Sequence, residues 1–323
     1  MLGKTKYKPP YTITSKMLTL STEIGVELTQ LESNTINITP KLRKKNRVKT
    51  LAGTLEIEGN FLGEEKITAI LEGKRVLGTM QEVTEVEGAI NAYKKFDNYK
   101  YDKLEDLLGA HKILMNGLLN NAGNFRNVNV GVGSSEGVTH VAPPFGNVPE
   151  LMNNLFEWLK NSDEHPLIKS CVFHYEFEFI HPFTDGNGRI GRLWQSIILY
   201  NWKNVFNAIP TEGIIRDYQD RYYEVLEESG SLGESTPFIE FMLEVILETI
   251  KSSVKDSVKS SVNTEDNIFE LLKQNPQSTI KELAHILDLT TRAIEKQISK
   301  LKIENRIVRI GSARKGYWNI IDE

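Results

Sequence analysis

The stretch from Phe179 to Trp202, FIHPFTDGNGRIGRLWQSIILYNW, determines the fold around it. An apolar segment stops before His181-Pro182, because proline disfavours helical geometry in the residue before it. The loop TDGNG follows, and RIGRLWQSIILYNW (189–202) then resumes helical spacing. We therefore predict two helices joined by a short loop that contains glycine.

This stretch combines the groups that a transfer reaction at phosphorus requires. Two glycines flank Asn187 at a helix start and let backbone N–H groups close on an anion. Arg189 and Arg192 fall on one helix face, where both can reach a polyphosphate. Asp185 is a hard oxygen ligand suited to Mg²⁺, and His181 can take a proton from a hydroxyl. Each feature alone is a weak signal, but their combination predicts a phosphoryl- or nucleotidyl-transfer site.

Helical periodicity dominates on the N-terminal side of the stretch, for example in LEDLLGAHKILMNGLL (104–119) and LIKSCVFHYEFEFI (167–180). One segment breaks the pattern. In NVNVGVGSSEGVTHVAPP (127–144), valines alternate with small or polar residues on both sides of SSEG, which predicts a β-hairpin from Val128 to Val141. A surface excursion without a role is the alternative. A lone hairpin among helices makes the main domain essentially α.

The twelve residues HPFTDGNGRIGR (181–192) resemble, at every fixed position, the motif HPFx(D/E)GNGRxxR of the Fic family. The motif specifies nine positions, so the resemblance is strong. It extends over roughly residues 60–250: CVFHYEFEFI, THVAPPFGNVPELMNNLFEWL and YQDRYYEVLEES are similar to family segments around the motif. The fold that it implies is a helical bundle with a β-hairpin flap.

By this resemblance the chain is expected to be a protein adenylyltransferase, which moves AMP from ATP to a Ser, Thr or Tyr hydroxyl and releases pyrophosphate. His181 would be the base that deprotonates the hydroxyl, and Asp185 would hold Mg²⁺ on the α- and β-phosphates. Arg189 would neutralise charge on the leaving pyrophosphate, and Arg192 would bind the γ-phosphate. The cradle of Gly186 to Gly188 would use backbone and amide donors.

The same resemblance implies roles for residues outside the motif. The hairpin would be a flap that aligns the target chain by strand addition, and self-modification is also expected. Phe183 would pack in the core. Tyr222 and Tyr223 would line the nucleoside pocket, with ordinary helix packing as the alternative for at least one of them. The nucleotide-binding set implied in this way comprises Gly186, Asn187, Gly188, Arg189, Ile190, Gly191, Arg192, Gly137, Val138, Thr139, His140, Tyr222 and Tyr223.

An inhibitory motif precedes the site. Thr54-Leu-Glu-Ile-Glu58-Gly59 matches the family pattern (S/T)xxxE(G/N) and falls in a plausible helix over about 50–60. By resemblance, Glu58 would pair with Arg192, remove the cation for the γ-phosphate and place negative charge where that phosphate belongs. Capping or solvating a helix is the alternative for Glu58. In some relatives this glutamate aligns a water that removes AMP, so the reverse activity stays open.

Residues 263–323 resemble a winged helix-turn-helix, with helices in NTEDNIFELLKQNP, STIKELAHILDL and TTRAIEKQISKLKIEN and a hairpin around GSARKG. Thr264 and either Ser278 or Thr279 are expected N-caps. The residues expected to face outward, at the wing tip and on the last helix, are Thr291, Arg292, Lys296, Ser299, Lys300, Arg314 and Lys315. DNA binding through this module and protein docking both stay open.

The predicted organisation is an N-terminal region (1–95), a Fic catalytic domain (96–250), a linker or helix extension (251–262) and a winged helix (263–323). Residues 61–263 carry 19 basic and 29 acidic side chains, which excludes a general attraction of the middle for nucleic acid. The absence of an eighteen-residue apolar run, of an N-terminal h-region and of cysteines beyond Cys171 predicts a soluble protein of the reducing cytoplasm with no membrane partner.

Hypotheses from other classes remain. The chain could be a DNA-binding transcriptional regulator whose Fic domain senses nucleotide or modifies only itself, although an intact His181 argues against a purely binding role. Transfer of UMP or phosphocholine is a further alternative, because the phosphate cradle is common to these donors. His111 and His174 are expected to be satisfied core histidines, and no spacing typical of a zinc site is present.

Overall fold

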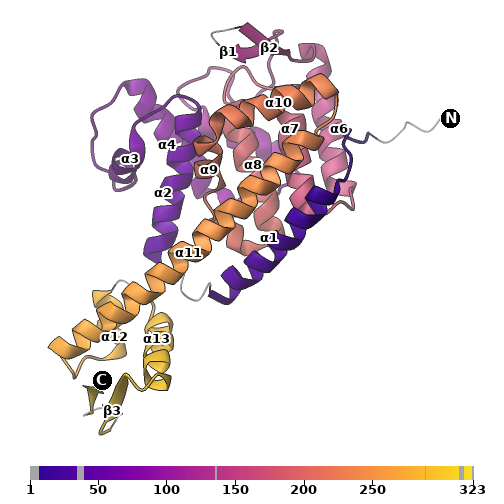
Figure 1. Cartoon of the computed structure of the whole chain (residues 1–323). Helices are drawn as coiled ribbons and strands as arrows, with labels where there is room; N and C mark the ends of the chain where they lie inside the picture. The colour runs from indigo at the N-terminus through magenta and orange to yellow at the C-terminus, as the bar shows by residue number, and fades with distance from the viewer. Residues whose placement is uncertain (1–6, 35–39, 135–136, 288, 313–315, 322–323) are drawn as a thin grey trace. The chain divides into compact units, whose positions relative to one another are not determined.

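The structure is a computed structural model that describes residues 7–34, 40–134, 137–287, 289–312 and 316–321. The described chain is mainly helical, with short antiparallel hairpins (Figure 1), which confirms the prediction of a mainly α protein. The α-helices are α1 (Ser15–Asn34), α2 (Pro40–Ile57), α3 (Gly63–Leu71), α4 (Met80–Lys94), α5 (Leu104–Leu114), α6 (Val148–Asn161), α7 (Pro166–Ile180), α8 (Asn187–Trp202), α9 (Thr211–Asp217), α10 (Gln219–Leu232), α11 (Thr236–Gln274), α12 (Ile280–Ile286) and α13 (Thr291–Ile303). Short 3₁₀-helices are η2 (Phe96–Asn98), η3 (Phe145–Asn147) and η4 (Asn204–Ala208).

The chain divides into two compact units. The first comprises Met1–Gly25 and Arg47–Thr249, and the second comprises Val26–Asn46 and Ile250–Glu323. The predicted domain boundaries near 95, 250 and 262 stay predictions. Among the described helices, none is long and apolar enough to cross a membrane.

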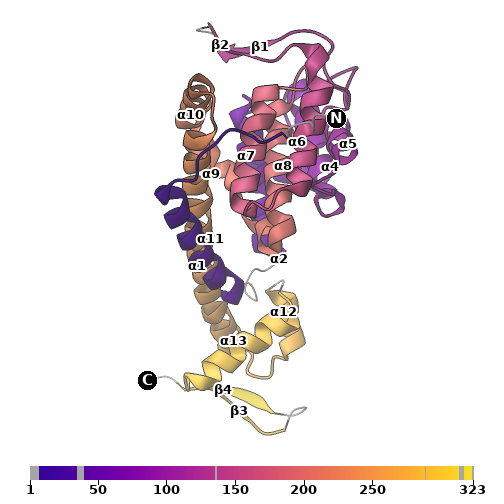
Figure 2. The ribbon, with the colours of Figure 1, turned by 90° about the vertical axis from the view of Figure 1, so that its right-hand side faces the viewer.

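The helices α7 and α8 form the centre of the first unit, side by side in both views (Figures 1 and 2). Apolar residues lie on every side of α7, and such a helix is stable only when other elements surround it. Its buried polar groups are paired: one ring nitrogen of His174 lies 2.6 Å from Gln195 Oε1, and the other lies 3.0 Å from the Tyr222 hydroxyl. His174 is therefore the satisfied core histidine that the sequence predicts.

The turn between α7 and α8 confirms the predicted break at His181-Pro182. The left-handed residue His181, with φ 48° and ψ 61°, follows the last helical residue, Ile180. Helix α8 begins at Asn187, two residues earlier than predicted. The reason is that Gly186 takes φ 83° and acts as the N-cap, so the helix can begin directly after it.

The predicted hairpin is present but shorter than expected. Strand β1 (Gly131–Ser134) pairs antiparallel with β2 (Gly137–Val141), with a register irregularity after Val132. It lies beyond one end of the α7–α8 pair in both views (Figures 1 and 2). Val128 and Val130 precede β1, which corrects the predicted start of the hairpin: the Val128 carbonyl accepts a hydrogen bond from Arg126 instead of joining the ladder.

The second unit contains the end of α11, then α12, α13 and the hairpin of β3 (Ile307–Ile310) and β4 (Tyr317–Ile320). Trp318 anchors β4, since its backbone N–H donates to Pro276 and its indole N–H donates to the Ser278 carbonyl, 3.1 Å away. Thr279 caps α12 in a capping box with Glu282, as one of the two expected N-caps. The helical core residues of this unit are Ile268, Phe269, Leu272, Leu283, Ile294, Ile298 and Leu301.

The expectation that Thr264 caps a new helix is wrong. Helix α11 runs without interruption from Thr236 to Gln274, so Thr264 lies inside it and the Ser/Lys-rich segment 251–262 is helical. A low-complexity stretch of lysine, serine and valine does not contain the proline or glycine that would end a helix. The expected wing-tip residues Arg314 and Lys315 lie outside the described residues.

Close packing of α4 on α5 leads to a stability prediction. A methyl group added at Gly88 would collide with the Leu114 carbonyl oxygen, whereas one added at Gly109 meets nothing within 4 Å. We expect Gly88→Ala to lower the free energy of unfolding by about 1–3 kcal/mol, because neither backbone can yield. Gly109→Ala on α5 should raise it by about 0.5–1 kcal/mol through helix propensity. Urea denaturation of both variants measures the difference, and equal effects would contradict the close approach.

Candidate active site

The loop between α7 and α8 is closed by the side chain of Asn187. Its Oδ1 accepts from the Phe183 N–H, and its Nδ2 donates to the Phe183 carbonyl, both at 2.9 Å. Asn187 was expected to contact phosphate through its amide, but this side chain is already engaged with the loop. Only the backbone N–H of Asn187 is left to face an anion at the start of α8.

Phe183 and His111 pack together against the loop between α7 and α8. The Phe183 side chain is completely buried and stacks on the His111 ring with centroids 3.6 Å apart. His111 Nε2 donates to the Asp185 carbonyl, and its Nδ1 accepts from the Gly123 N–H, each at 2.9 Å. Both ring nitrogens are thus used, so His111 is a satisfied core histidine, as expected. The sequence analysis did not predict that it would support the loop.

The start of α8 has the features of an anion site. No side chain caps this end of the helix, so its first N–H groups and the positive end of its dipole are available to an anion. A Cβ at Gly186 would lie 2.7 Å from Met115 Sδ, and the positive φ also favours glycine there. Of the other predicted cradle residues, Ile190 is buried in the core, and Gly191 packs against Glu178.

Asp185 is the residue at this site that could hold a metal ion. Its side chain is 55% exposed, and its Oδ1 accepts from the Gly186 N–H at 2.6 Å and from Arg189 Nη2 at 3.2 Å. Among the described residues there is no cluster of three metal-ligating side chains. A single exposed carboxylate beside a phosphate cradle nevertheless fits Mg²⁺, which binds through one or two carboxylates, water and substrate phosphates.

The structure brings the second motif arginine, Arg192, together with the predicted inhibitory residue Glu58. Arg192 is buried, and its Nη2 donates to Glu58 Oε1 at 2.7 Å. The same guanidinium donates to the hydroxyl and to the carbonyl of Thr54, both at 3.1 Å. Thr54 and Glu58, the first and fifth residues of the motif TLEIEG, therefore bind one cation. Burial acts to lower the pKa of Arg192, but the charge and hydrogen bond of Glu58, together with Tyr222 and Glu178, outweigh it, so the pKa is raised.

Glu58 follows the last residue of α2, and Gly59 makes this position possible. Gly59 takes φ 87°, and its N–H donates to the Glu56 carbonyl as the helix ends. A left-handed backbone conformation favours glycine or asparagine. This explains why the last position of the motif (S/T)xxxE(G/N) is one of these two residues. Glu58 also lies against Gly188, where any side chain would collide with its carboxylate. The carboxylate thus lies directly against the first turn of α8.

The two predicted nucleoside-pocket tyrosines lie in different surroundings. Tyr222 is 1% exposed, and its hydroxyl lies 3.0 Å from His174, so its ring belongs to the helix packing that was the alternative interpretation. Tyr223 is 47% exposed. Strand β2 contains the predicted residues Gly137, Val138, Thr139 and His140; its backbone is described, and their side chains lie outside the described residues.

A buried carboxyl that the sequence analysis missed lies behind Arg192. The Glu178 side chain is 13% exposed, and its Oε1 has no hydrogen-bond partner among the described residues. Burial raises the pKa of Glu178 to about 8, with Arg192 acting against this shift and Glu58 adding to it. No local pattern marks this residue, since Glu176, two residues earlier, interrupts the apolar end of the helix in the same way.

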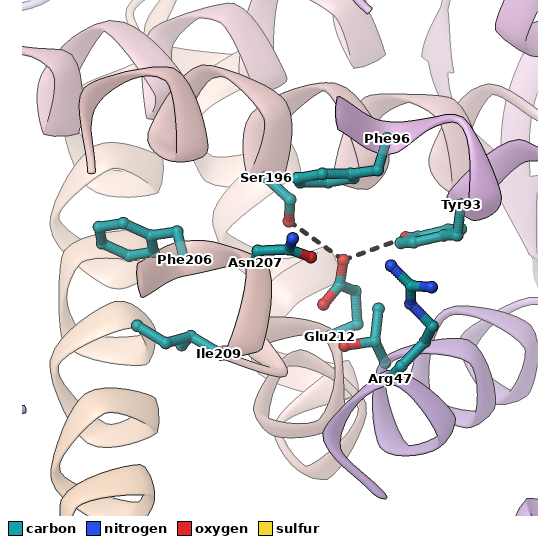
Figure 3. Close-up of a pocket in the computed structure, with 9 residues that line it drawn as sticks. Arg47, Tyr93, Phe96, Ser196, Phe206, Asn207, Ile209 and Glu212 are labelled. Carbon is teal, nitrogen blue, oxygen red and sulfur yellow. Dashed lines mark hydrogen bonds between the residues drawn. The ribbon is translucent and has the colours of Figure 1, made fainter. Parts of the chain in front are cut away.

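A small polar pocket is lined by residues of α2, α4, α8 and α9, among them Arg47, Tyr93, Ser196 and Glu212. Figure 3 shows Glu212 between Tyr93 and Ser196, whose hydroxyls donate to its Oε1 at 3.1 and 3.2 Å. The pocket has a volume of about 20 Å³, roughly one water molecule. Glu212 Oε2 has no hydrogen-bond partner among the described residues, so a water molecule suits this space. Burial raises the pKa of Glu212.

Glu178 makes the stability of the protein depend on pH. Its pKa of about 8 in the folded state exceeds the 4.5 of an ordinary glutamate, so the folded protein binds this proton more tightly. The stabilisation is complete below pH 4.5 and is lost as the pH rises through 8. In Glu178→Gln this part of the pH dependence should vanish, as measured by urea denaturation between pH 5 and 9. Exposed Glu157→Gln on α6 is the control, and an unchanged wild-type slope in Glu178→Gln would contradict the assignment.

Comparisons with known proteins find similarity over the region that contains this site. Residues 101–199 match the model of the Fic/DOC family. The chain is 32% identical over 199 residues to "Protein adenylyltransferase Fic" from Nematostella vectensis, which is 58% of this chain and 44% of that protein. It is 30% identical over 202 residues to "Protein adenylyltransferase fic-1" from Caenorhabditis elegans, 58% of this chain and 37% of that protein. The chain thus spans less than half the length of these relatives.

A solved structure matches nearly the whole chain. The crystal structure of a Fic family protein from Desulfovibrio desulfuricans G20 is 38% identical, with a TM-score of 0.74, over 98% of this chain and 99% of that one. This likeness extends well beyond the motif, to both compact units. With the motif loop, the helical bundle and the hairpin described above, it shows that the chain belongs to the Fic family.

Proposed function

We propose that the protein is an adenylyltransferase that transfers AMP from ATP to a hydroxyl of a target protein and of itself. The observation that carries this proposal is the composition of one loop. Between the ends of α7 and α8 it gathers a histidine, an exposed carboxylate, an uncapped helix start and two buried arginines. Relatives that share this region are named protein adenylyltransferases, which favours AMP over other transferred groups.

The proposed reaction uses His181 as a general base. It removes the proton of a Ser, Thr or Tyr hydroxyl as the oxygen attacks the α-phosphorus of ATP. The bond between the α-phosphorus and the bridging oxygen breaks, and pyrophosphate leaves. Arg189 neutralises the charge that develops on this leaving group, and the N–H groups at the start of α8 hold the phosphates. Catalysis of this kind rests on positioning and electrostatic stabilisation.

Three further parts complete the proposal. Asp185 would hold Mg²⁺, which, when bound, neutralises phosphate charge. Tyr223, on the exposed side of α10, would contact the nucleoside, with the buried Tyr222 supporting it. The hairpin of β1 and β2 would bind the target chain by strand addition, as an exposed strand edge allows.

We further propose that Glu58 inhibits the enzyme. Arg192 is the cation assigned to the γ-phosphate, and Glu58 and Thr54 already occupy it. ATP could enter only with its γ-phosphate displaced by the carboxylate, and the α-phosphate would then lie out of line for attack. The close approach of Glu58 to Gly188 supports this, since carboxylate and phosphate compete for the same space.

Label transfer from α-labelled ATP with Mg²⁺ tests the activity and the inhibition together. Glu58→Gly should raise self-labelling about 10- to 100-fold over wild type, because a charge-assisted hydrogen bond of about 1.5–3 kcal/mol no longer competes. Adding His181→Ala to Glu58→Gly should abolish labelling. The matched control is Glu56→Gln against Glu58→Gln. Glu56, two residues before Glu58, pairs with Arg216 at 2.9 Å, so only the Glu58 variant should gain activity.

The outcomes separate the two claims. If Glu58→Gly binds ATP but does not label, the inhibitory role falls, and the other donors or the nucleotide-sensing regulator take precedence. If Glu58→Gly and the double variant label equally, His181 is not the base.

The second unit supports a further function. We propose that α11, α12, α13 and the β3–β4 hairpin form a winged helix-turn-helix that binds DNA through α13. The predicted outward residues on this helix are exposed, and among them Arg292, Lys296 and Ser299 lie along one side. Lys300 contributes less, because it pairs with Glu265 at 2.6 Å.

Gel shift of the full chain with random duplex DNA tests this proposal. We expect binding that weakens steeply between 50 and 200 mM salt, and Arg292→Ala with Lys296→Ala to weaken it at least tenfold, since each phosphate contact releases counterions. Glu295→Gln, on the same helix, is the control. No binding, or binding that does not depend on salt, would favour a protein-docking module instead.

A further inference from the structure

Arg126 lies where the chain enters the hairpin and is 2% exposed. Its side chain donates hydrogen bonds in several directions. Nε donates to the His181 carbonyl at 2.8 Å, Nη1 donates to the Val128 carbonyl at 2.8 Å, and Nη2 donates to the Pro143 carbonyl. The backbone N–H of Arg126 adds a bond of 2.9 Å to the Pro182 carbonyl.

These partners belong to three separate segments of the chain. Val128 precedes β1, Pro143 follows β2, and His181 begins the catalytic loop. One planar guanidinium therefore joins both ends of the hairpin to the loop. Lysine could not do the same, because a single ammonium lacks the fixed fork of donors that spans three directions.

Arg126 is also an unusual buried cation. All the partners of its guanidinium are backbone carbonyls, and among the described residues no carboxylate bonds to it. Burial accordingly lowers its pKa. A buried charge without a counter-ion is unfavourable for the folded protein. Hydrophobic packing does not require an arginine at this buried position. The hydrogen bonds that its guanidinium donates in fixed directions are therefore the reason for it.

The bond to His181 constrains a residue with unusual backbone geometry. His181 lies in the left-handed region, with φ 48° and ψ 61°, which residues other than glycine rarely adopt. Its N–H donates to the Phe177 carbonyl, and its own carbonyl accepts from Arg126. Both peptide groups of His181 are thereby held, and the direction of its side chain depends on them.

We infer that Arg126 is a positioning residue that sets the base His181 relative to the hairpin on which the target chain lies. This inference rests on the proposed function, in which the hairpin binds the target and His181 deprotonates its hydroxyl. A target held by the hairpin is thus brought to the base through one rigid link. Rates of such transfers fall about 100-fold when the reacting groups are misplaced by about 1 Å.

The test is made in full-length Glu58→Gly protein, with Arg126→Lys, which keeps the charge, and Arg126→Gln, which removes it. The maximal rate of self-labelling from α-labelled ATP should fall about 10- to 100-fold in both variants. The KM for ATP should stay within about twofold, because Arg126 bonds to none of the residues from Gly186 to Arg192. This split between rate and KM separates positioning from a general loss of structure.

A second measurement does not depend on activity. Hydrogen exchange of the backbone should speed up together in residues 127–130 and 181–184 of both Arg126 variants. Tyr7→Phe is the matched control: it removes a buried hydrogen bond of 2.6 Å to Glu176 on α7 without touching the loop or the hairpin. It should change neither the rate of labelling nor the exchange of these two segments.

The outcomes distinguish this inference from the proposed function. If Arg126→Lys and Arg126→Gln label and exchange like their parent, the inference is overturned. If Arg126→Lys does not fold, the uncharged Arg126→Gln decides in the same way. If the Glu58→Gly parent itself does not label, the proposed function fails, and exchange in the two segments still decides whether Arg126 joins them.

Discussion

The amide of Asn187 closes the turn between α7 and α8, and the site depends on this closure. The chain must reverse direction within six residues between two buried helices. The loop between them makes few backbone–backbone hydrogen bonds within itself. Asn187 satisfies both the N–H and the carbonyl of Phe183, which fixes Phe183 in the core against His111. The start of α8 is thereby held beside the end of α7, so His181 and the first turn of α8 keep one geometry.

Arg192 connects this turn to the N-terminal part of the chain. A guanidinium buried this deeply requires acceptors, and Thr54 and Glu58 at the end of α2 supply them. Under the proposed function these acceptors stand where a phosphate would bind, so the contacts that satisfy Arg192 would also be the ones that inhibit the enzyme. Burial raises the pKa of the nearby Glu178, whose Oε1 has no hydrogen-bond partner among the described residues, and the carboxylate of Glu58 adds to this shift.

Packing decided several features that residue patterns left open or got wrong. The side chain of Asn187 was expected at the phosphate and is engaged with Phe183, because the loop needs it there. Tyr222 was a candidate for the nucleoside pocket and lies against His174 in the core. Helix α11 continues through Thr264, since nothing in the sequence ends it. Each outcome depends on the packing of the folded chain, which the residue types of a short sequence segment do not reveal.

The sequence by itself determined the turn at His181-Pro182 and the residues of the motif. Both are local, since proline, glycine and helical spacing act over a few residues. The pairing of Glu58 with Arg192, 134 residues apart, was implied only by the resemblance of two short motifs to family patterns, and the structure contains this contact. Only the tertiary structure decided the parts played by His111, Glu178 and Arg126. Their partners are backbone groups or buried charges that folding brings together from distant segments. Every residue has a backbone carbonyl, so a hydrogen bond to one cannot be predicted from the residue types.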